Sequence, residues 1–372
     1  VTTFRPVFDN QVKSLAALPN GKLAVGGEFT KVNGVAKVGF VTLDPVTGAT
    51  TTMPNLIVEN RVAGGTVSVR SLKVSGNFLY LGGVFTHLTT PGNLAVYSRN
   101  AARVSVVNLA ADKTWTPNLD GGVLEVSPSA DGTRIYLAGY FATSNGATFN
   151  KVGALTASTG AIIPWTPRFN TTDATRQYQF TVQDTPVKTW VGGSNHQMMI
   201  YDRATLRWMN GYHAREGGDF QASVVDRGAN VIYGGCHCGD FLFTGTVANG
   251  WPTSFVQADT ISLVGGWNAS TGVYQQDFAP VMISRAGYGV WATFIDSQGS
   301  LWAGGSIQSS LSTLGLGQWS GGFAKYARRD SLAPATPKTL AVTGTSTTAT
   351  LTWAAGSTEA PTYEILANDR VI

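Results

Sequence analysis

Short apolar runs that end in two small residues recur along the chain at nearly even intervals. The clearest copies are LAVGGEFT, LYLGGVFT and IYLAGYFAT, in which the first small residue is Gly26, Gly82 or Ala138. Degenerate copies, TWVGGSNH, VIYGGCHC and LWAGGSIQ, place that residue at Gly192, Gly234 and Gly304. Self-similarity at such a spacing identifies an array of like structural units.

Each copy has the internal order of a small antiparallel sheet. In the first, the run VKSLAAL is followed by the turn PNGK, then LAVGGEFT, then GFVTLDPVTGATT. The runs are short, rich in Val, Leu, Tyr and Phe, and separated by Asn-Gly, Asp-Gly or Thr-Gly, which predicts strands joined by tight turns. No helical periodicity extends beyond a turn or two. Four strands in roughly 45 to 55 residues are typical of one β-propeller blade.

The ends of the chain suggest how the array closes. Blades one, two, three and five end in short motifs at Met53, Trp115, Trp165 and Phe278, but the last blade shows no such closing strand. A segment with that character, FRPVFDN, instead precedes the first repeat. We therefore predict an all-β chain whose residues 1–327 form a six-bladed β-propeller closed by the N-terminal strand, which leaves no long edge strand unpaired. Five or seven blades, or an open stack of hairpins, are the alternatives.

The composition changes after residue 327. Residues 328–338 form a linker with Pro and Ala, and residues 339–372 contain two alternating strands around Trp353 and a third that starts at Tyr363. This segment resembles the first part of a fibronectin type III β-sandwich, in which a Trp packs against a Tyr. Because such a domain needs about 90 to 100 residues, we expect a partial, truncated domain here. Further domains or neighbouring chains are expected beyond Ile372.

The overall composition favours an extracellular protein. Only 13% of the residues are charged, 44 of 372 are Gly, and the net charge of +4 is scattered without a basic cluster or basic helical face. We therefore expect no nucleic-acid partner. No run of 18 apolar residues is present, so we expect no membrane span. The start at Val1 is consistent with a mature product after signal-peptide removal, which predicts a secreted or cell-surface location.

The fourth and fifth copies depart from the pattern of the first three. After the small pair and one spacer, the first three copies carry Phe29, Phe85 and Phe141, which we interpret as wedges packed between blades; the later copies carry Asn195, His237 and Ile307. A buried polar side chain requires hydrogen-bonding partners, and repeats depart from their own pattern at functional sites. The candidate ligand-binding residues are Asn195, His196, His213, Glu216, Asp219, His237 and Asp240. Alternatively, His237 is a hydrogen-bonded core residue, and the acidic residues are solvated or cap turns.

The two cysteines flank one of these candidates. In an extended strand Cys236 and Cys238 face the same side, while His237 faces the other. Their Cα atoms would lie about 6.5 Å apart, so a disulfide requires a bend, which Gly239 could provide. A strained local disulfide is the first choice for a secreted chain. Reduced thiols and a metal site are the alternatives, but no further ligand spacing supports a metal.

Signatures of catalysis are absent from the sequence. There is no GxSxG elbow, P-loop, HExxH motif, EF-hand loop or dinucleotide fingerprint. An acid and base pair could be assembled from Glu216, Asp219, Asp240 and His213, but a sequence does not show whether two such groups face each other. We expect no cofactor, and we favour a protein without enzymatic activity while leaving that question open.

The motifs together resemble a known group of proteins. GGEFTKVNG, LDPVTGA, WTP, WVGGSNHQMMIYDRATL, GGDFQASVVD, GGCHCGD and LWAGGSI, followed by the fibronectin-like start, are similar to the secreted repeat β-propellers common in actinobacteria. These proteins are often joined to fibronectin type III and lectin-like modules. The resemblance implies a surface or secreted protein and supplies no catalytic residues. Similar propellers also resemble parts of phage tail-tip proteins.

Two classes of function follow from this resemblance and from the polar substitutions. In the first, the propeller is an extracellular binding or adhesion module that displays a face to a glycan or cell-wall polymer. Sugar rings stack on exposed aromatic side chains, and the candidates are Trp208, Trp251 and Trp267. In the second, the chain is a polysaccharide hydrolase or lyase, which requires two carboxylates, or a His and a carboxylate, that converge in a pocket. A structural subunit of a surface filament or phage tail tip is the third alternative.

Overall fold

The chain is an all-β protein. The computed structural model describes residues 3–51, 56–169, 171–215, 218–244, 256–278, 280–284, 288–311, 317–328, 338–354, 365–367 and 370–371. In these ranges the chain forms strands β1 to β36 and one short 3-10 turn, Ala174–Arg176. The all-β prediction is therefore confirmed.

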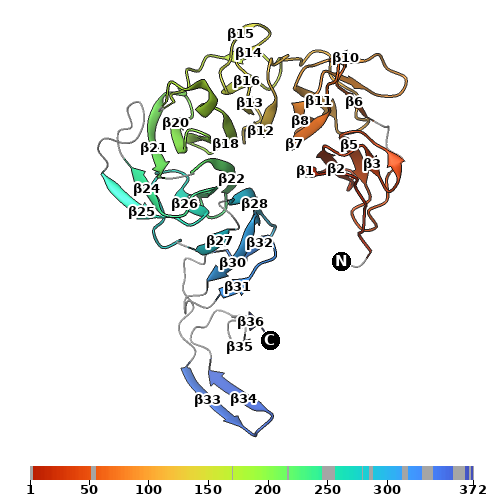
Figure 1. Cartoon of the computed structure of the whole chain (residues 1–372). Coiled ribbons are helices and arrows are strands. Elements are labelled where there is room, and N and C mark those ends of the chain that lie inside the picture. The colour runs from red at the N-terminus through yellow and green to blue at the C-terminus, as the bar shows by residue number, and fades with distance from the viewer. Residues whose placement is uncertain are drawn as a thin grey trace.

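Six sheets share one plan, in which an innermost strand pairs with a middle strand that ends in the small residues, followed by a third strand. They follow one another along an arc from red β1 to blue β32 (Figure 1). The three shared strands of each sheet are β1 (Val12–Ala17), β2 (Leu23–Gly27) and β5 (Phe40–Leu43); β7 (Ser68–Ser75), β8 (Phe78–Val84) and β11 (Ala101–Ser105); β12 (Val123–Pro128), β13 (Arg134–Gly139) and β16 (Val152–Thr156); β18 (Gln179–Asp184), β19 (Lys188–Gly193) and β20 (Gln197–Asp202); β22 (Phe220–Asp226), β23 (Val231–Cys236) and β26 (Val264–Asn268); β28 (Val290–Ile295), β29 (Leu301–Gly305) and β32 (Phe323–Tyr326).

Two of these six sheets contain additional strands, and the loops between the shared strands form smaller sheets. The third sheet adds β17 (Ile162–Ile163), and the fourth adds β21 (Trp208–Ala214), β24 (Phe241–Thr244) and β25 (Gln257–Thr260). The small sheets are β3 (Lys31–Val32) with β4 (Val35–Ala36); β6 (Ile57–Glu59), β9 (His87–Thr89) and β10 (Val96–Tyr97); β14 (Thr143–Ser144) with β15 (Ala147–Thr148); and β27 (Val281–Ser284), β30 (Ile307–Leu311) and β31 (Gly317–Trp319).

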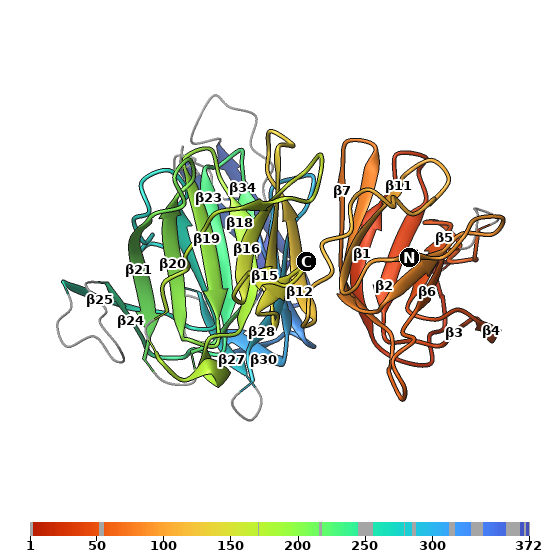
Figure 2. The same ribbon diagram turned by 90° about the horizontal axis from the view of Figure 1, so that it is seen from above.

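The first small residue of each pair allows the next sheet to approach closely. A Cβ atom on Gly26 would lie 2.8 Å from Val69 Cγ1 of the second sheet, and one on Gly192 would lie 2.7 Å from Phe220 Cβ of the fifth. The innermost strands accordingly contact one another in the order β1, β7, β12, β18, β22 and β28, along the inside of the arc in Figure 1. Figure 2 shows the neighbouring strands β1, β7 and β12 from above. Gly304 of the sixth sheet differs, because a Cβ atom there would meet nothing within 4 Å.

The core lies between neighbouring sheets. Phe29, Phe85 and Phe141 are fully buried, as their interpretation as wedges requires. The closing motifs also pack at these junctions: Trp115 and Tyr80 form an edge-to-face contact with 5.3 Å between ring centroids, and Phe278 meets Tyr233 at 5.0 Å. Each closing aromatic residue thus contacts the middle strand of the sheet that precedes it in the chain.

The N-terminal segment lies on the first sheet. Phe8 forms a bridge with Val32 of β3, and its ring centroid is 4.9 Å from that of Phe29. Asp9 Oδ1 accepts hydrogen bonds from the backbone N–H groups of Thr30 and Lys31. In the described part of the chain, the sheet of β28, β29 and β32 contains no N-terminal strand. Asp120 makes the same contacts with Ala142 and Thr143 of the third sheet, so the closure of the last sheet by the N-terminal segment stays a prediction.

The C-terminal region contains a separate hairpin, β33 (Lys338–Gly344) with β34 (Ala349–Ala354), and a short pair, β35 (Leu366–Ala367) with β36 (Arg370–Val371). Leu340 and Val342 of β33 are exposed. Most of the expected linker, at 329–337, and Tyr363 lie outside the described residues, so the expected contact between Trp353 and Tyr363 is not described.

Candidate ligand-binding site

Each innermost strand carries one extra residue opposite the small pair. The strand register shifts at this point in all six sheets, for example between Val12 and Ser14 in β1 and between Val290 and Ala292 in β28. Such β-bulges redirect a side chain and are frequent beside functional sites. The six bulge residues are Lys13, Arg70, Leu124, Phe180, Gln221 and Trp291.

Five of the six bulge residues border one cavity between the innermost strands, which we call the channel. This cavity of about 680 Å³ is lined by residues of all six innermost strands, including every bulge residue except Trp291. Trp291 is itself half-exposed, at 49%. The bulges of the first five sheets therefore place side chains of different chemistry around one space.

A second set of residues lies at the end of the middle strands, directly after the small pair. Each of their backbone N–H groups donates to the carbonyl oxygen of the residue that precedes an innermost strand, at 2.8 to 3.1 Å. We call this set the rim. The rim residues are Glu28, Tyr140, Ser194, His237 and Ser306.

The strand register corrects the interpretation of His237 as a replaced wedge. Phe220 pairs with Cys236 as Val123 pairs with Gly139, so Cys236 takes the place of the second small residue. The backbone N–H of Leu263 donates to the oxygen of Cys238, as Lys151 donates to Phe141. The wedge position of the fifth sheet therefore belongs to Cys238, and His237 is a rim residue. The prediction was wrong by one residue because the apparent pair Gly234-Gly235 begins one position too early.

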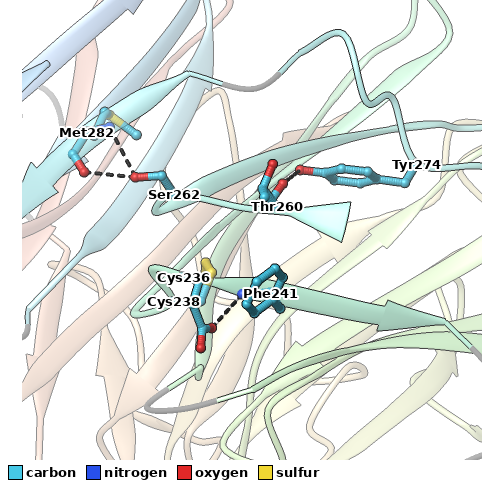
Figure 3. Close-up of a disulfide and its surroundings, with 8 residues drawn as sticks. Cys236, Cys238, Phe241, Thr260, Ser262, Tyr274 and Met282 are labelled. Atoms are coloured by element: carbon cyan, nitrogen blue, oxygen red, sulfur yellow. Dashed lines mark hydrogen bonds between the residues drawn. A yellow bond between two sulfur atoms is a disulfide. The ribbon is translucent and has the colours of Figure 1, made fainter. Parts of the chain in front are cut away.

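The two cysteines lie within the core of the fifth sheet. The structure pairs Cys236 with Cys238, with their Cα atoms 5.2 Å apart (Figure 3), which is within the usual range for a disulfide. Both residues are fully buried. At the wedge position, the pair fills space that a Phe ring fills in the first three sheets.

His237 stands beside two exposed aromatic residues. Its ring centroid is 5.1 Å from that of Trp291, and Tyr288 lies 6.1 Å from Trp291 with the two rings tilted by 32°. Tyr288 is 52% exposed. Burial lowers the pKa of His237, and the nearby Asp219 opposes that shift only in part. The imidazole is therefore a neutral neighbour of the aromatic pair near pH 7.

Asp219 connects His237 with a second histidine. Its backbone oxygen accepts the N–H of His237 at 3.1 Å, and its Oδ1 lies 3.2 Å from His196 Nε2. The side chains of His196 and Asp219 each remain more than a quarter exposed. His196 adopts a φ of 58° in the tight turn that leads directly to β20. Of the predicted residues, His196, Asp219 and His237 are thus brought together.

Two other predicted residues lie behind this group. Asn195 occupies the wedge position of the fourth sheet and is buried, with its amide bonded to the side chains of Gln179 and Gln197, both at 3.3 Å. His213 is also buried; its burial, followed by the nearby His196, lowers its pKa to about 4. Both residues therefore support the site from the core instead of presenting polar atoms to a ligand.

The remaining candidates are not part of the group. Asp240 lies 3.8 Å from Arg215 and accepts the N–H of Phe241, while Glu216 and Trp251 lie outside the described residues. Trp267 is fully buried, and the ring of Trp208 lies 4.4 Å from the guanidinium of Arg168. Among the described residues, no three His, Cys, Asp or Glu side chains group as a metal site requires.

The first two sheets contribute charged residues to the same end of the channel. Glu28 Oε1 lies 3.1 Å from Arg70 Nη2 and 3.9 Å from Lys13 Nζ. Glu28 and Arg70 also border a second cavity, of about 910 Å³, between these two sheets. The charged residues of the rim and bulge positions therefore lie on the first two sheets, and the aromatic ones, Tyr140, Phe180 and Trp291, lie on the later sheets.

Sequence reasoning missed the bulge residues, although a signal was present. Aligning the first strands as VKSL, VRSL, VLEV, QFTV, FQAS and VWAT would have shown one variable residue between two constrained positions. A bulge residue does not alternate with its neighbours in the way that period-two patterns assume. The bulge position therefore breaks the alternation by which strand faces are recognised in a sequence.

Comparisons with known proteins assign no family. No protein-family model matches the chain, and no curated protein matches it. Two crystal structures of the extracellular domain of BT4673 from B. thetaiotaomicron are similar, with TM-scores of 0.47, identities of 13% and 12%, and 87% and 89% of this chain covered. The chain spans about a third of each of those structures, 34% and 33%. Similarity at this level supports no assignment of ligand or activity.

No helix in the described part of the chain is long and apolar enough to cross a membrane.

Proposed function

We propose that the chain is an extracellular or cell-surface binding protein, acting in adhesion, whose rim and bulge residues form a glycan-binding face. The observation that carries this proposal is the half-exposed pair Trp291 and Tyr288 beside His237 and the Asp219–His196 pair. Aromatic faces provide stacking area for a sugar ring, and adjacent polar groups provide hydrogen bonds to its hydroxyl groups.

We propose that the chain has the architecture of a six-bladed β-propeller followed by the start of a fibronectin type III domain. Support comes from the common plan of the six sheets and from the uncovered Gly304, where a neighbouring sheet is expected by analogy with Gly26. The exposed side chains of Leu340 and Val342 on β33 are of the kind that a second sheet covers in a β-sandwich. A location outside the cell is consistent with the low charge content.

A glycan array with the full chain tests the binding function. We expect binding to at least one bacterial or plant polysaccharide, and Trp291→Ala should weaken it by about 2 kcal/mol, roughly 30-fold. Trp319→Ala is the matched control, because Trp319 is more exposed, at 72%, but belongs to β31 of a separate small sheet. Silence across the array, or equal effects of the two substitutions, would contradict the proposal.

A polysaccharide hydrolase or lyase is the second candidate, and the His196–Asp219 pair favours it. An imidazole 3.2 Å from a carboxylate oxygen is an arrangement that general acid–base catalysis uses. Neither of the two cavities described above includes this pair, so we rank this candidate below binding. Release of reducing ends or unsaturated sugars from any bound polysaccharide, abolished by His196→Ala, would establish it.

A further inference from the structure

The channel is basic on one side at the level of the bulges. Lys13 and Arg70 are the bulge residues of β1 and β7, two innermost strands that contact each other. The other bulge residues, Leu124, Phe180, Gln221 and Trp291, carry no charge. Two adjacent cations therefore line the cavity together with the aromatic residue Phe180, and Trp291 holds the same bulge position on β28.

A third cation extends the basic side. Lys73 lies three residues beyond Arg70 on β7 and lines the same cavity of about 680 Å³. The charged residues of that lining are Lys13, Arg70, Lys73 and Glu125. The carboxylate oxygens of Glu125 accept hydrogen bonds from Gln183 Nε2, at 2.7 Å, and from the backbone N–H of Val182, at 2.9 Å. The channel wall thus carries more positive than negative groups.

One carboxylate at the rim holds the two bulge cations. Glu28 contacts Arg70 at 3.1 Å and Lys13 at 3.9 Å, and it also accepts a hydrogen bond from Ser68 Oγ at 3.1 Å. Because these three side chains are only about a quarter to a third exposed, their positions are constrained before any ligand binds. A ligand carboxylate in the channel would meet preorganised cations, with Glu28 as a competing anion.

We infer that the ligand is an acidic polysaccharide, in which the carboxylate of a hexuronate binds Lys13 and Arg70 while sugar rings pack against the aromatic bulge residues Phe180 and Trp291. This inference rests on the proposed glycan-binding function and names its substrate class. Arg and Lys form charge-assisted hydrogen bonds with carboxylates, and aromatic rings supply the apolar contact for the sugar face. A neutral glycan would leave the basic side of the channel unused.

The test compares acidic polymers with their neutral counterparts. The full chain is assayed by affinity electrophoresis against polygalacturonate, alginate and hyaluronate, each beside its carboxyl-reduced derivative, which keeps the sugar backbone. We expect at least one acidic polymer to bind, and reduction to lower the affinity roughly tenfold or more. The difference should shrink as salt rises from about 0.05 M to about 0.5 M, because salt screens the charges.

Variants assign the effect to named residues. The double substitution Lys13→Met, Arg70→Met should bring the acidic and reduced polymers to equal affinity. Lys22→Met is the matched control, since Lys22 pairs with Asp44 at 3.2 Å and lies outside both cavities. Glu28→Gln removes the competing anion and should strengthen acidic binding severalfold, a gain that a folding defect does not produce.

Three outcomes would overturn the inference: equal binding of acidic and reduced polymers, no change in the double variant, or equal binding of inorganic polyphosphate, which indicates charge alone. Binding of neutral polymers that Trp291→Ala abolishes would leave the proposed glycan function intact while removing this inference. Absence of binding to every polymer, acidic or neutral, would remove both.

Discussion

Trp115 packs edge to face against Tyr80, with ring centroids 5.3 Å apart, and this contact joins the second sheet to the third. The same contact recurs between Trp165 and Tyr136, at 6.2 Å. Trp302 holds the corresponding position in the sixth sheet, since its neighbours in LWAGG match those of Tyr80 in LYLGG. By analogy, we expect Trp302 to contact an aromatic residue of a closing motif, as Tyr80 contacts Trp115.

Phe4 is the predicted partner of Trp302. The segment FRPVFD matches WTPNLD, and Asp9 accepts the N–H groups of Thr30 and Lys31 as Asp120 accepts those of Ala142 and Thr143. Docking of the first sheet against the sixth would bring Phe4 onto Trp302. We expect a coupling energy of about 0.5 to 1.5 kcal/mol in a double-mutant cycle of Phe4→Ala and Trp302→Ala, measured by urea unfolding.

Gly304 provides the control for this prediction. In a closed ring, Gly304→Leu should destabilise the chain, because the innermost strand β1 would pack there as β7 packs on Gly26. In an open arrangement that substitution meets no atom within 4 Å and should leave stability unchanged. Additive effects of Phe4→Ala and Trp302→Ala, together with a neutral Gly304→Leu, would show that the ring does not close in this way.

The all-β class could be predicted from the sequence because the close packing of neighbouring sheets restricts particular positions to small residues. Gly26 and Gly82 repeat where a neighbouring sheet leaves no room for a Cβ atom, so the periodicity is readable without a structure. The register of the fifth sheet was not readable, because Gly234 imitates the first residue of the pair while Cys236 replaces the second. The contact of Asp219 with His196 joins two sheets and leaves no pattern in the sequence.

The pairing of Cys236 with Cys238 can be tested directly. Because both cysteines are buried, the chain is unfolded in denaturant; we expect it to resist alkylation until a reductant is added, after which intact mass should rise by two alkyl groups. Replacing both residues with Ala should lower the free energy of unfolding by about 2 kcal/mol or more, combining the short-loop constraint with lost buried volume. Alkylation of the unreduced, unfolded chain at both residues would contradict the pairing.

Stability should depend on pH through His213. Its pKa falls from 6.5 to about 4 in the folded chain, because burial disfavours the charged imidazole. The unfolded state therefore binds a proton that the folded state does not bind between these values, and stability decreases as pH falls from about 6.5 to about 4. The loss should not exceed about 3 kcal/mol, and it should level off below pH 4.

Urea unfolding at a series of pH values measures this loss. His213→Phe should remove much of the slope between pH 6.5 and 4, whereas His87→Phe is the histidine control, because burial also lowers the pKa of His87 but its side chain is more exposed than that of His213. An unchanged slope in the His213 variant would assign the pH dependence to other groups.

Ser71 links the second and third sheets from within the channel wall. Its Oγ accepts the backbone N–H of Val126 at 3.0 Å, as Ser14 Oγ accepts that of Leu72 at 2.8 Å. Ser71→Ala leaves a buried N–H without this acceptor, so we expect the free energy of unfolding to fall by about 1 to 3 kcal/mol. Ser71→Thr keeps the hydroxyl and serves as the matched variant, and Ser75→Ala at the end of β7 controls for the loss of a hydroxyl in the same strand.

Because the hydrogen bond between Ser71 and Val126 joins the innermost strands β7 and β12, hydrogen exchange in Ser71→Ala should accelerate at Val126 more than at Leu72. Equal acceleration at both amides would show that the substitution loosens β7 as a whole.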